Sequence, residues 1–127
     1  MENAITNIAL STHVNREALH RMIYNESKGN YNTGFDKHHY STGIAQISKS
    51  VWEQYSKIPY EHAGDKKYWV ENLTIGAKYL KENYNKFGNW RDALSAYNMG
   101  PNALRQYQQG LRQMPKITQN YIKGFNN

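Results

Sequence analysis

The sequence predicts a mainly α-helical protein with a single domain. Apolar residues recur at three- and four-residue spacing along most of the chain, which is the periodicity of a helix with one buried face. Residues that begin or end helices interrupt this pattern at intervals typical of short helices. The 127 residues contain no cysteine, yet they suffice for one core without disulfide bonds. Because no repeat or linker divides the chain, we expect one domain over residues 1–127.

The first third of the chain predicts two helices followed by an irregular segment. Residues 2–12 form a weakly amphipathic helix, and Asn15 can cap a second helix that runs to about Glu26, before Gly29. Residues 30–42 have no apolar period. We therefore expect a loop or a small β excursion there, which would make the fold α+β at most.

The middle of the chain predicts a short helix and then the longest one. Ser48 is placed to cap a helix through Tyr55, and Pro59 ends this region. Asp65 is placed to cap the longest helix, which Gly88 ends. The expected inward face of that helix consists of Trp69, Leu73, Gly76, Ala77, Leu80, Tyr84 and Phe87.

The last third predicts three short helices. Asn89 caps the first, which ends at Gly100. Pro101 is suited to the first position of the next, which extends towards Gly110. The last helix follows Pro115, and its apolar residues are Ile117, Tyr121, Ile122 and Phe125.

Composition restricts the classes of function. The net charge of +6 favours polyanionic partners, which include nucleic acid, anionic membrane surfaces and an anionic cell wall. The basic residues are scattered, however, and no nucleic-acid motif accompanies them. No apolar run approaches the roughly 20 residues of a membrane span. The five histidines, including the pair His38-His39, show no zinc spacing, so we expect neither a metal nor a cofactor. Phosphate-binding glycine loops and a serine nucleophile motif are also missing.

Glu26 is the candidate catalytic residue. It follows Leu19, Met22 and Ile23 at the i, i+3, i+4, i+7 spacing that places side chains on one inward face of a helix. Removal from water favours the neutral form of a carboxyl group. A protonated acid at neutral pH is what the cleavage of a glycosidic bond requires.

Three further segments are unusual for simple helix packing. In residues 41–46 a glycine and Gln46 interrupt an apolar run, and a buried amide must either hold the backbone or face a ligand. In residues 96–101 a helix ends in a Tyr-Asn-Met-Gly-Pro turn that can present a phenol and an amide to a cleft. The third segment begins at Pro115 and carries Thr118, Asn120 and Tyr121.

In this order and spacing the segments resemble the lytic transglycosylases related to goose-type lysozyme. The Glu-Ser pair of that family is matched by Glu26-Ser27, and its Gly-Leu-Met-Gln segment by residues 43–46. Its Ala-Tyr-Asn-Ala-Gly-Pro segment is matched by residues 96–101, and its Pro with Thr-x-x-Tyr-Val by residues 115–122. The resemblance covers roughly residues 16 to 123. It implies a lysozyme-like fold and a monomer that acts on peptidoglycan glycan strands.

Two departures from the family pattern bear on the chemistry. Ala45 replaces the family's methionine, which opens space in the cleft. The stretch between Glu26 and Gly43 is longer than usual, and it contains Asp36 together with the histidine pair.

The resemblance implies that Glu26 protonates the oxygen between N-acetylmuramic acid and N-acetylglucosamine and then removes the proton of the muramoyl 6-hydroxyl. An anhydro ring closes and no second carboxylate is needed. Ser27 and Gln46 would orient Glu26 or the acetamido group. Tyr97, Asn98 and Tyr121 would line the site and bind substrate.

Two alternatives stay open. In the first, Asp36 is a second carboxylate that activates water, and the enzyme is a hydrolytic muramidase. In the second, the domain binds glycan or nucleic acid without cutting it, and Glu26 is structural.

We expect the protein to act on the bacterial wall, in the periplasm or outside the cell. The N-terminus does not read as a signal peptide, so a holin, a virion or a secretion apparatus would deliver it, as for a phage lysis enzyme.

Overall fold

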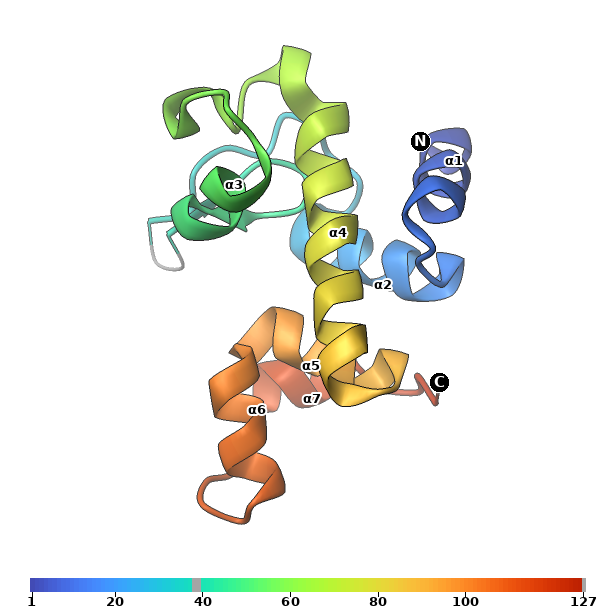
Figure 1. Cartoon of the computed structure of the whole chain (residues 1–127), viewed down its shortest axis with the longest axis vertical. Helices are drawn as coiled ribbons and strands as arrows, with labels where there is room; N and C mark the ends of the chain where they lie inside the picture. The colour runs from blue at the N-terminus through green and yellow to red at the C-terminus, as the bar shows by residue number, and fades with distance from the viewer. Residues whose placement is uncertain (38–39, 127) are drawn as a thin grey trace. The chain divides into compact units, whose positions relative to one another are not determined.

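The computed structural model describes residues 1–37 and 40–126. Over these residues the chain forms seven α-helices, two short 3-10 helices and one two-stranded sheet (Figure 1). The predicted class, mainly α with a small β excursion, is confirmed. The chain divides into two compact units, residues 1–79 and 80–127. The expectation of one domain over residues 1–127 stays a prediction.

The first unit begins with two helices that pack against each other, α1 (Glu2–Thr12) and α2 (Arg16–Ser27). The amide N–H of Ala18 donates to the side chain of Asn15 over 2.9 Å, which confirms Asn15 as the cap of α2. Arg16 joins the two helices, since its guanidinium pairs with the carboxylate of Glu2 and donates to the hydroxyl of Thr6.

A β-hairpin follows α2 later in the first unit. Strands β1 (Ser41–Thr42) and β2 (Ile47–Ser48) are antiparallel, with Ser41 opposite Ser48. An isolated bridge between Asp36 and Ser41 extends the pairing. The β excursion therefore ends later than predicted, because its return strand comes after the tight turn of residues 43–46.

The remainder of the first unit is helical. It contains α3 (Lys49–Tyr55), the 3-10 helices η1 (Tyr60–His62) and η2 (Lys66–Tyr68), and the first part of α4 (Trp69–Phe87). Ser48 stands at the N-cap position of α3, but Asp65 precedes η2 and not the longest helix, α4, which begins at Trp69. Neither side chain makes a capping hydrogen bond, so both cap predictions are wrong. Asp65 instead pairs with the imidazole of His62 over 2.9 Å.

The second unit contains the end of α4, then α5 (Trp90–Met99), α6 (Pro101–Gln108) and α7 (Lys116–Tyr121). Helix α5 packs against both α6 and α7. The side chain of Asn89 accepts from the amide of Asp92 over 2.8 Å, as a capping residue should. Helix α7 ends earlier than its apolar pattern predicts: Ile117 is 61% exposed, whereas Ile122 and Phe125 are buried beyond the helix.

Apolar side chains of both units are buried as the helical periodicity predicts. On α4, the central residues of the expected inward face are fully buried, namely Leu73, Ala77 and Leu80, while Trp69, Tyr84 and Phe87 are half-buried. Within the described ranges, none of the helices combines the length and the apolar character needed to cross a membrane.

Candidate active site

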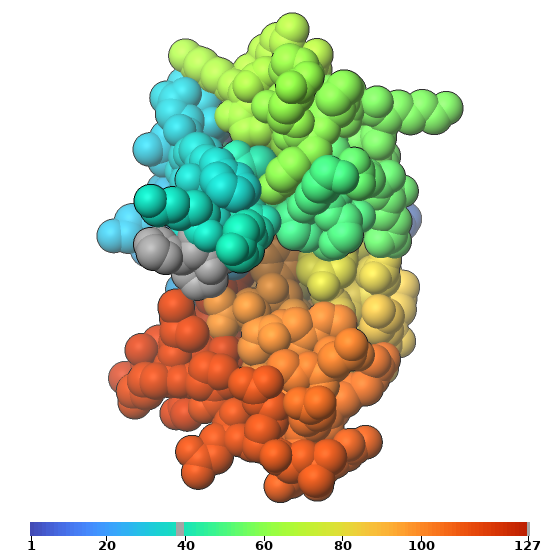
Figure 2. Space-filling model, turned by 90° about the vertical axis from the view of Figure 1, so that its left-hand side faces the viewer, coloured from blue at the N-terminus to red at the C-terminus, as the bar shows by residue number. Residues whose placement is uncertain are grey.

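Glu26 lines a groove of about 560 Å³ in the first unit. The other lining residues come from the segment after α2 and from the hairpin turn: Thr33, Gly34, Phe35, Asp36, Lys37 and Gln46. Figure 2 shows the segment after α2, in cyan, at the surface of the molecule. Three sequence-predicted residues, Glu26, Asp36 and Gln46, are thus brought to one groove.

The position of Glu26 follows from where α2 ends. Leu19, Met22 and Ile23 on the same helix face are buried, whereas Glu26 is half-buried. The helix ends one residue later at Ser27, and Lys28 adopts the left-handed conformation with φ 55°. The apolar stripe therefore emerges from the core in the last turn, which leaves the carboxyl group at the wall of a groove that solvent can enter.

Part of the groove wall is held in place by the side-chain amide of Gln46. Its nitrogen donates to the carbonyl of Gly43 over 2.9 Å and to the carbonyl of Gly34 over 3.2 Å. Its oxygen accepts from the hydroxyl of Ser41 over 2.9 Å. Both N–H groups of the amide are thereby used, and within residues 1–37 and 40–126 its oxygen accepts this one bond, which leaves a second lone pair for a ligand.

Asn72, which was not among the predicted site residues, fixes the hairpin turn to α4. Its side chain is fully buried; the nitrogen donates to the carbonyls of Thr42 and Ala63 over 3.1 and 2.9 Å, and the oxygen accepts from the amide of Ala45 over 2.9 Å. The signal that could have found Asn72 is a polar amide next to Leu73 on the predicted inward face, because buried amides need partners.

Ser27 and Asp36 occupy different positions relative to the groove. The hydroxyl of Ser27 donates to the carbonyl of Ile23 over 3.4 Å, and among the residues that the structure describes Ser27 does not line the groove. Asp36 lines it, and its backbone is paired with Ser41 through hydrogen bonds of 2.7 and 3.3 Å. The pair His38-His39 lies outside the described residues.

The remaining predicted site residues belong to the second unit. Tyr97 and Asn98 stand in the last turn of α5, and both are half-buried. Asn98 accepts from the hydroxyl of Thr118 over 2.6 Å, so two of the segments singled out in the sequence meet here. Tyr121 is 4% exposed. In the described part of the chain no three His, Asp or Glu side chains gather as a metal site would require.

The fold is similar to that of a solved lytic transglycosylase. The X-ray structure of an inactive mutant of the lytic transglycosylase Slt from Pseudomonas aeruginosa matches with a TM-score of 0.69 and 19% sequence identity, over 94% of this chain and 20% of that one. The chain thus spans about a fifth of the length of that protein. This likeness defines the class of fold, the lysozyme-like fold of the lytic transglycosylases.

The family follows from the sequence match. The model of the transglycosylase SLT domain matches residues 3–120, nearly the whole chain. The protein belongs to this family, as the resemblance of its motifs predicted. Comparison with curated proteins gives no match.

Proposed function

We propose that the protein cleaves the β-1,4 bond between N-acetylmuramic acid and N-acetylglucosamine in peptidoglycan and leaves 1,6-anhydromuramoyl ends. The observation that carries this proposal is the position of Glu26, a half-buried carboxyl group in the last turn of α2 at the wall of a groove. Membership of the transglycosylase SLT family supports the reaction class. The similar Slt structure is of a variant described as inactive, and in it a glutamate is replaced by glutamine.

One carboxyl group can perform both proton transfers of this reaction. Glu26, protonated, gives its proton to the oxygen of the scissile bond as that bond breaks. The substrate's acetamido group stabilises the cationic sugar. Glu26, now ionised, takes the proton of the muramoyl 6-hydroxyl, whose oxygen forms the new bond to the anomeric carbon. Atoms balance without water, and the enzyme regains its starting protonation state.

The other predicted residues serve this reaction in different ways. Gln46 shapes the groove wall through its hydrogen bonds to Gly34 and Gly43, and its oxygen can accept one bond from substrate. Ser27 would support the end of α2. Tyr97, Asn98 and Tyr121 would bind the sugar, with Asn98 oriented by Thr118.

Replacement of the acid tests the proposal. We expect Glu26→Gln to lower turnover of purified sacculi by about 10²–10⁴-fold, because general acid–base catalysis contributes on that order. Glu17→Gln is the matched control, since Glu17 lies in the first turn of the same helix with a side chain 75% exposed. It should retain full activity. Near-normal turnover by Glu26→Gln would end the proposal.

Hydrolysis is the second candidate, and a specific observation favours it: Asp36 lines the same groove as Glu26. A second carboxylate could activate water, which inverting enzymes do with the two carboxyl groups ~6.5–9.5 Å apart. Mass spectrometry of the products separates the two reactions, because anhydro ends are lighter than hydrolysed ends by one water. We expect anhydro ends, both from the unmodified protein and from Asp36→Asn.

The proposal also covers the oligomeric state of the enzyme and its delivery to the cell wall. The enzyme would act as a monomer on the bacterial wall, and a holin, a virion or a secretion apparatus would bring it there. Sedimentation velocity of the purified chain tests the first point, since a concentration-dependent shift to a larger species would contradict a monomer.

A further inference from the structure

The second unit contains a pocket of about 670 Å³ that the proposed reaction does not use. It is lined by the first turn of α5, by the end of α6 and the loop after it, and by α7 with the segment that follows. Its apolar lining includes the buried side chains of Ile122 and Phe125 and the half-buried side chain of Met114.

The charged residues of this pocket are all basic. Arg91, Arg112 and Lys123 line it, and no aspartate or glutamate lines it within residues 80–126. The two acidic residues of the second unit are engaged elsewhere: Glu82 lies 3.6 Å from the ammonium group of Lys86, and Asp92 accepts from the side chains of Asn89 and Gln108. The described lining of the pocket therefore carries three basic side chains and no aspartate or glutamate.

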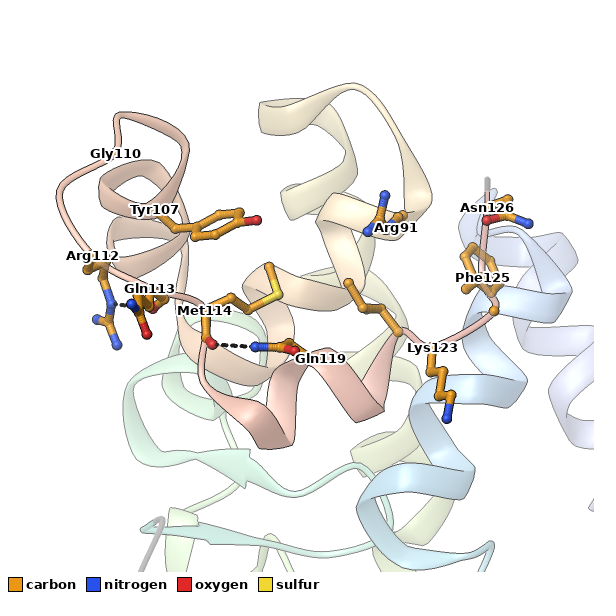
Figure 3. Close-up of a pocket in the computed structure, with 12 residues that line it drawn as sticks. Arg91, Tyr107, Gly110, Arg112, Gln113, Met114, Gln119, Lys123, Phe125 and Asn126 are labelled. Atoms are coloured by element: carbon orange, nitrogen blue, oxygen red, sulfur yellow. Dashed lines mark hydrogen bonds between the residues drawn. The ribbon is translucent and has the colours of Figure 1, made fainter.

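The side chains around the pocket are arranged to hold a ligand with both apolar and charged groups. In Figure 3 the ring of Tyr107 and the thioether of Met114 point into the hollow, and Arg91 lies across from them. The loop that carries Met114 is fixed, because the amide of Gln119 donates to the carbonyl of Met114 over 2.9 Å.

We propose that this pocket binds a short peptide that bears carboxylates. Arginine pairs with a carboxylate through two parallel hydrogen bonds, which suits Arg91 to such a group. The apolar side chains of Met114, Ile122 and Phe125 favour a peptide with small aliphatic groups over a phosphate polymer, which has none to bury. Peptidoglycan carries such peptides on its glycan strands, so the source of the peptide rests on the proposed function.

Binding of a synthetic peptidoglycan stem tetrapeptide tests the proposal directly. Isothermal titration is carried out with the full chain, both unmodified and as Glu26→Gln. We expect saturable binding that weakens at least tenfold when the peptide's carboxylates are converted to amides, since hydrogen bonds to charged groups are the stronger ones. Arg91→Gln should weaken binding about tenfold. Met114→Ala should weaken it too, through loss of apolar contact.

The matched control is Lys116→Gln, which removes the same charge from the same unit at an exposed position outside the pocket. It should change the dissociation constant less than twofold. Absence of peptide binding, equal binding of the amidated peptide, or equal weakening by Lys116→Gln would each overturn the proposal. So would tighter, competing binding of polyphosphate or single-stranded DNA. Titration measures peptide binding and needs no cleavage. A negative titration would therefore refute the peptide site alone, whereas retained activity of Glu26→Gln would refute the proposed reaction.

Discussion

At the scale of single residues, the side chain of Gln46 connects three points of the groove wall. Its amide nitrogen donates to the carbonyl of Gly43 in the same turn and to the carbonyl of Gly34 in the segment after α2. Its amide oxygen accepts from the hydroxyl of Ser41 on β1. The backbone of Gln46 has φ 51°, so the residue occupies a left-handed conformation that few side chains adopt. The hydrogen bonds of the side chain offset that conformational cost.

Exchange of this amide for a carboxylate should disrupt the groove. Gln46→Glu removes both N–H donors and places negative charge against two carbonyl oxygens. We expect a loss of unfolding free energy of about 1–3 kcal/mol, because the carbonyl of the buried Gly43 loses its donor from this amide, as does that of the exposed Gly34. We also expect a clear fall in kcat/KM on sacculi. Urea unfolding and turbidity assays measure the two effects.

Gln106→Glu is the control for that prediction. Gln106 is exposed on α6, and the same exchange there should leave the urea midpoint and the activity unchanged. Wild-type stability and activity of Gln46→Glu would contradict the assigned role of the amide.

How far the residues of the groove could be predicted depends on the kind of signal each one gives. Glu26 was predictable because a carboxyl group interrupts an apolar helical stripe. Gln46 was predictable because an amide interrupts an apolar run. Asn72 was missed, since it occupies a helix position between Glu71 and Leu73 and its partners Thr42 and Ala63 are distant in sequence. The partners of a buried amide are set by the packing of elements, which a single sequence does not state.

At the scale of elements, the hairpin turn depends on the absence of a side chain at Gly43. Its φ of 85° favours glycine, and a Cβ placed there would overlap the amide of Asn72. Gly88 has nearly the same φ of 86°, but a Cβ there would meet no atom within 4 Å. Substitution of Gly88 therefore adds backbone strain alone, whereas substitution of Gly43 adds backbone strain and steric overlap.

Alanine at these two positions should therefore differ in cost. Gly88→Ala should lower the free energy of unfolding by about 1–2 kcal/mol, the strain of a left-handed residue. Gly43→Ala should lower it by more, because the turn must also move away from Asn72, and it should reduce activity as the groove wall shifts. Thermal unfolding compares the variants. An equal loss of stability in the two variants would contradict this, because it would show that the turn accommodates the added Cβ at no further cost in free energy.

The short helix η1 is joined to the hairpin by Tyr60, whose hydroxyl donates to the carbonyl of Ile47 over 2.8 Å. Burial raises the pKa of the Tyr60 phenol above its usual 10.0. Above pH 10 the unfolded chain ionises this phenol first, so the stability that it contributes is present below that pH and is lost as pH rises through the higher folded pKa.

Tyr60→Phe should remove this contribution. We expect the variant to be less stable than the unmodified protein at pH 8, because the carbonyl of Ile47 loses its donor. The difference in urea midpoint between the two proteins should narrow as the pH is raised past 10. A constant difference over pH 8–12 would contradict the assignment.

Helix ends could be predicted unequally well for a physical reason. Asn15 and Asn89 each accept from the amide three residues later, so a local pattern was sufficient. Ser48 and Asp65 have the residue types of caps, but Asp65 pairs with His62, and the hydroxyl of Ser48 lies 3.4 Å from that of Ser50. A competing local partner decides these cases, and residue type alone does not reveal it.

At the scale of the whole molecule, positive charge is concentrated in one part of the chain. Residues 80–127 contain seven basic and two acidic residues, whereas residues 1–79 contain nine and eight. Nearly all of the net charge of +6 thus belongs to the second unit. Basic residues are scattered along the sequence without runs of like charge, and the asymmetry arises from the shortage of acidic residues near the C-terminus.

This distribution predicts salt-dependent attachment to the anionic wall. Binding of Glu26→Gln to sacculi should weaken steadily as NaCl rises from 50 to 500 mM, since screening shortens the range of the attraction to a few ångströms. Co-sedimentation measures the bound fraction. Sacculi stripped of anionic polymers serve as the control and should show a smaller change. Binding that ignores salt would contradict an electrostatic contribution.

The bond from the Ala45 amide to Asn72 has a practical use beyond folding. The amide hydrogen of Ala45 is protected from exchange while the turn stays packed against α4. Its rate of exchange with deuterium would therefore measure how often the turn opens. A ligand that binds in the groove should slow the exchange of this amide hydrogen. NMR could follow the change in an inactive variant.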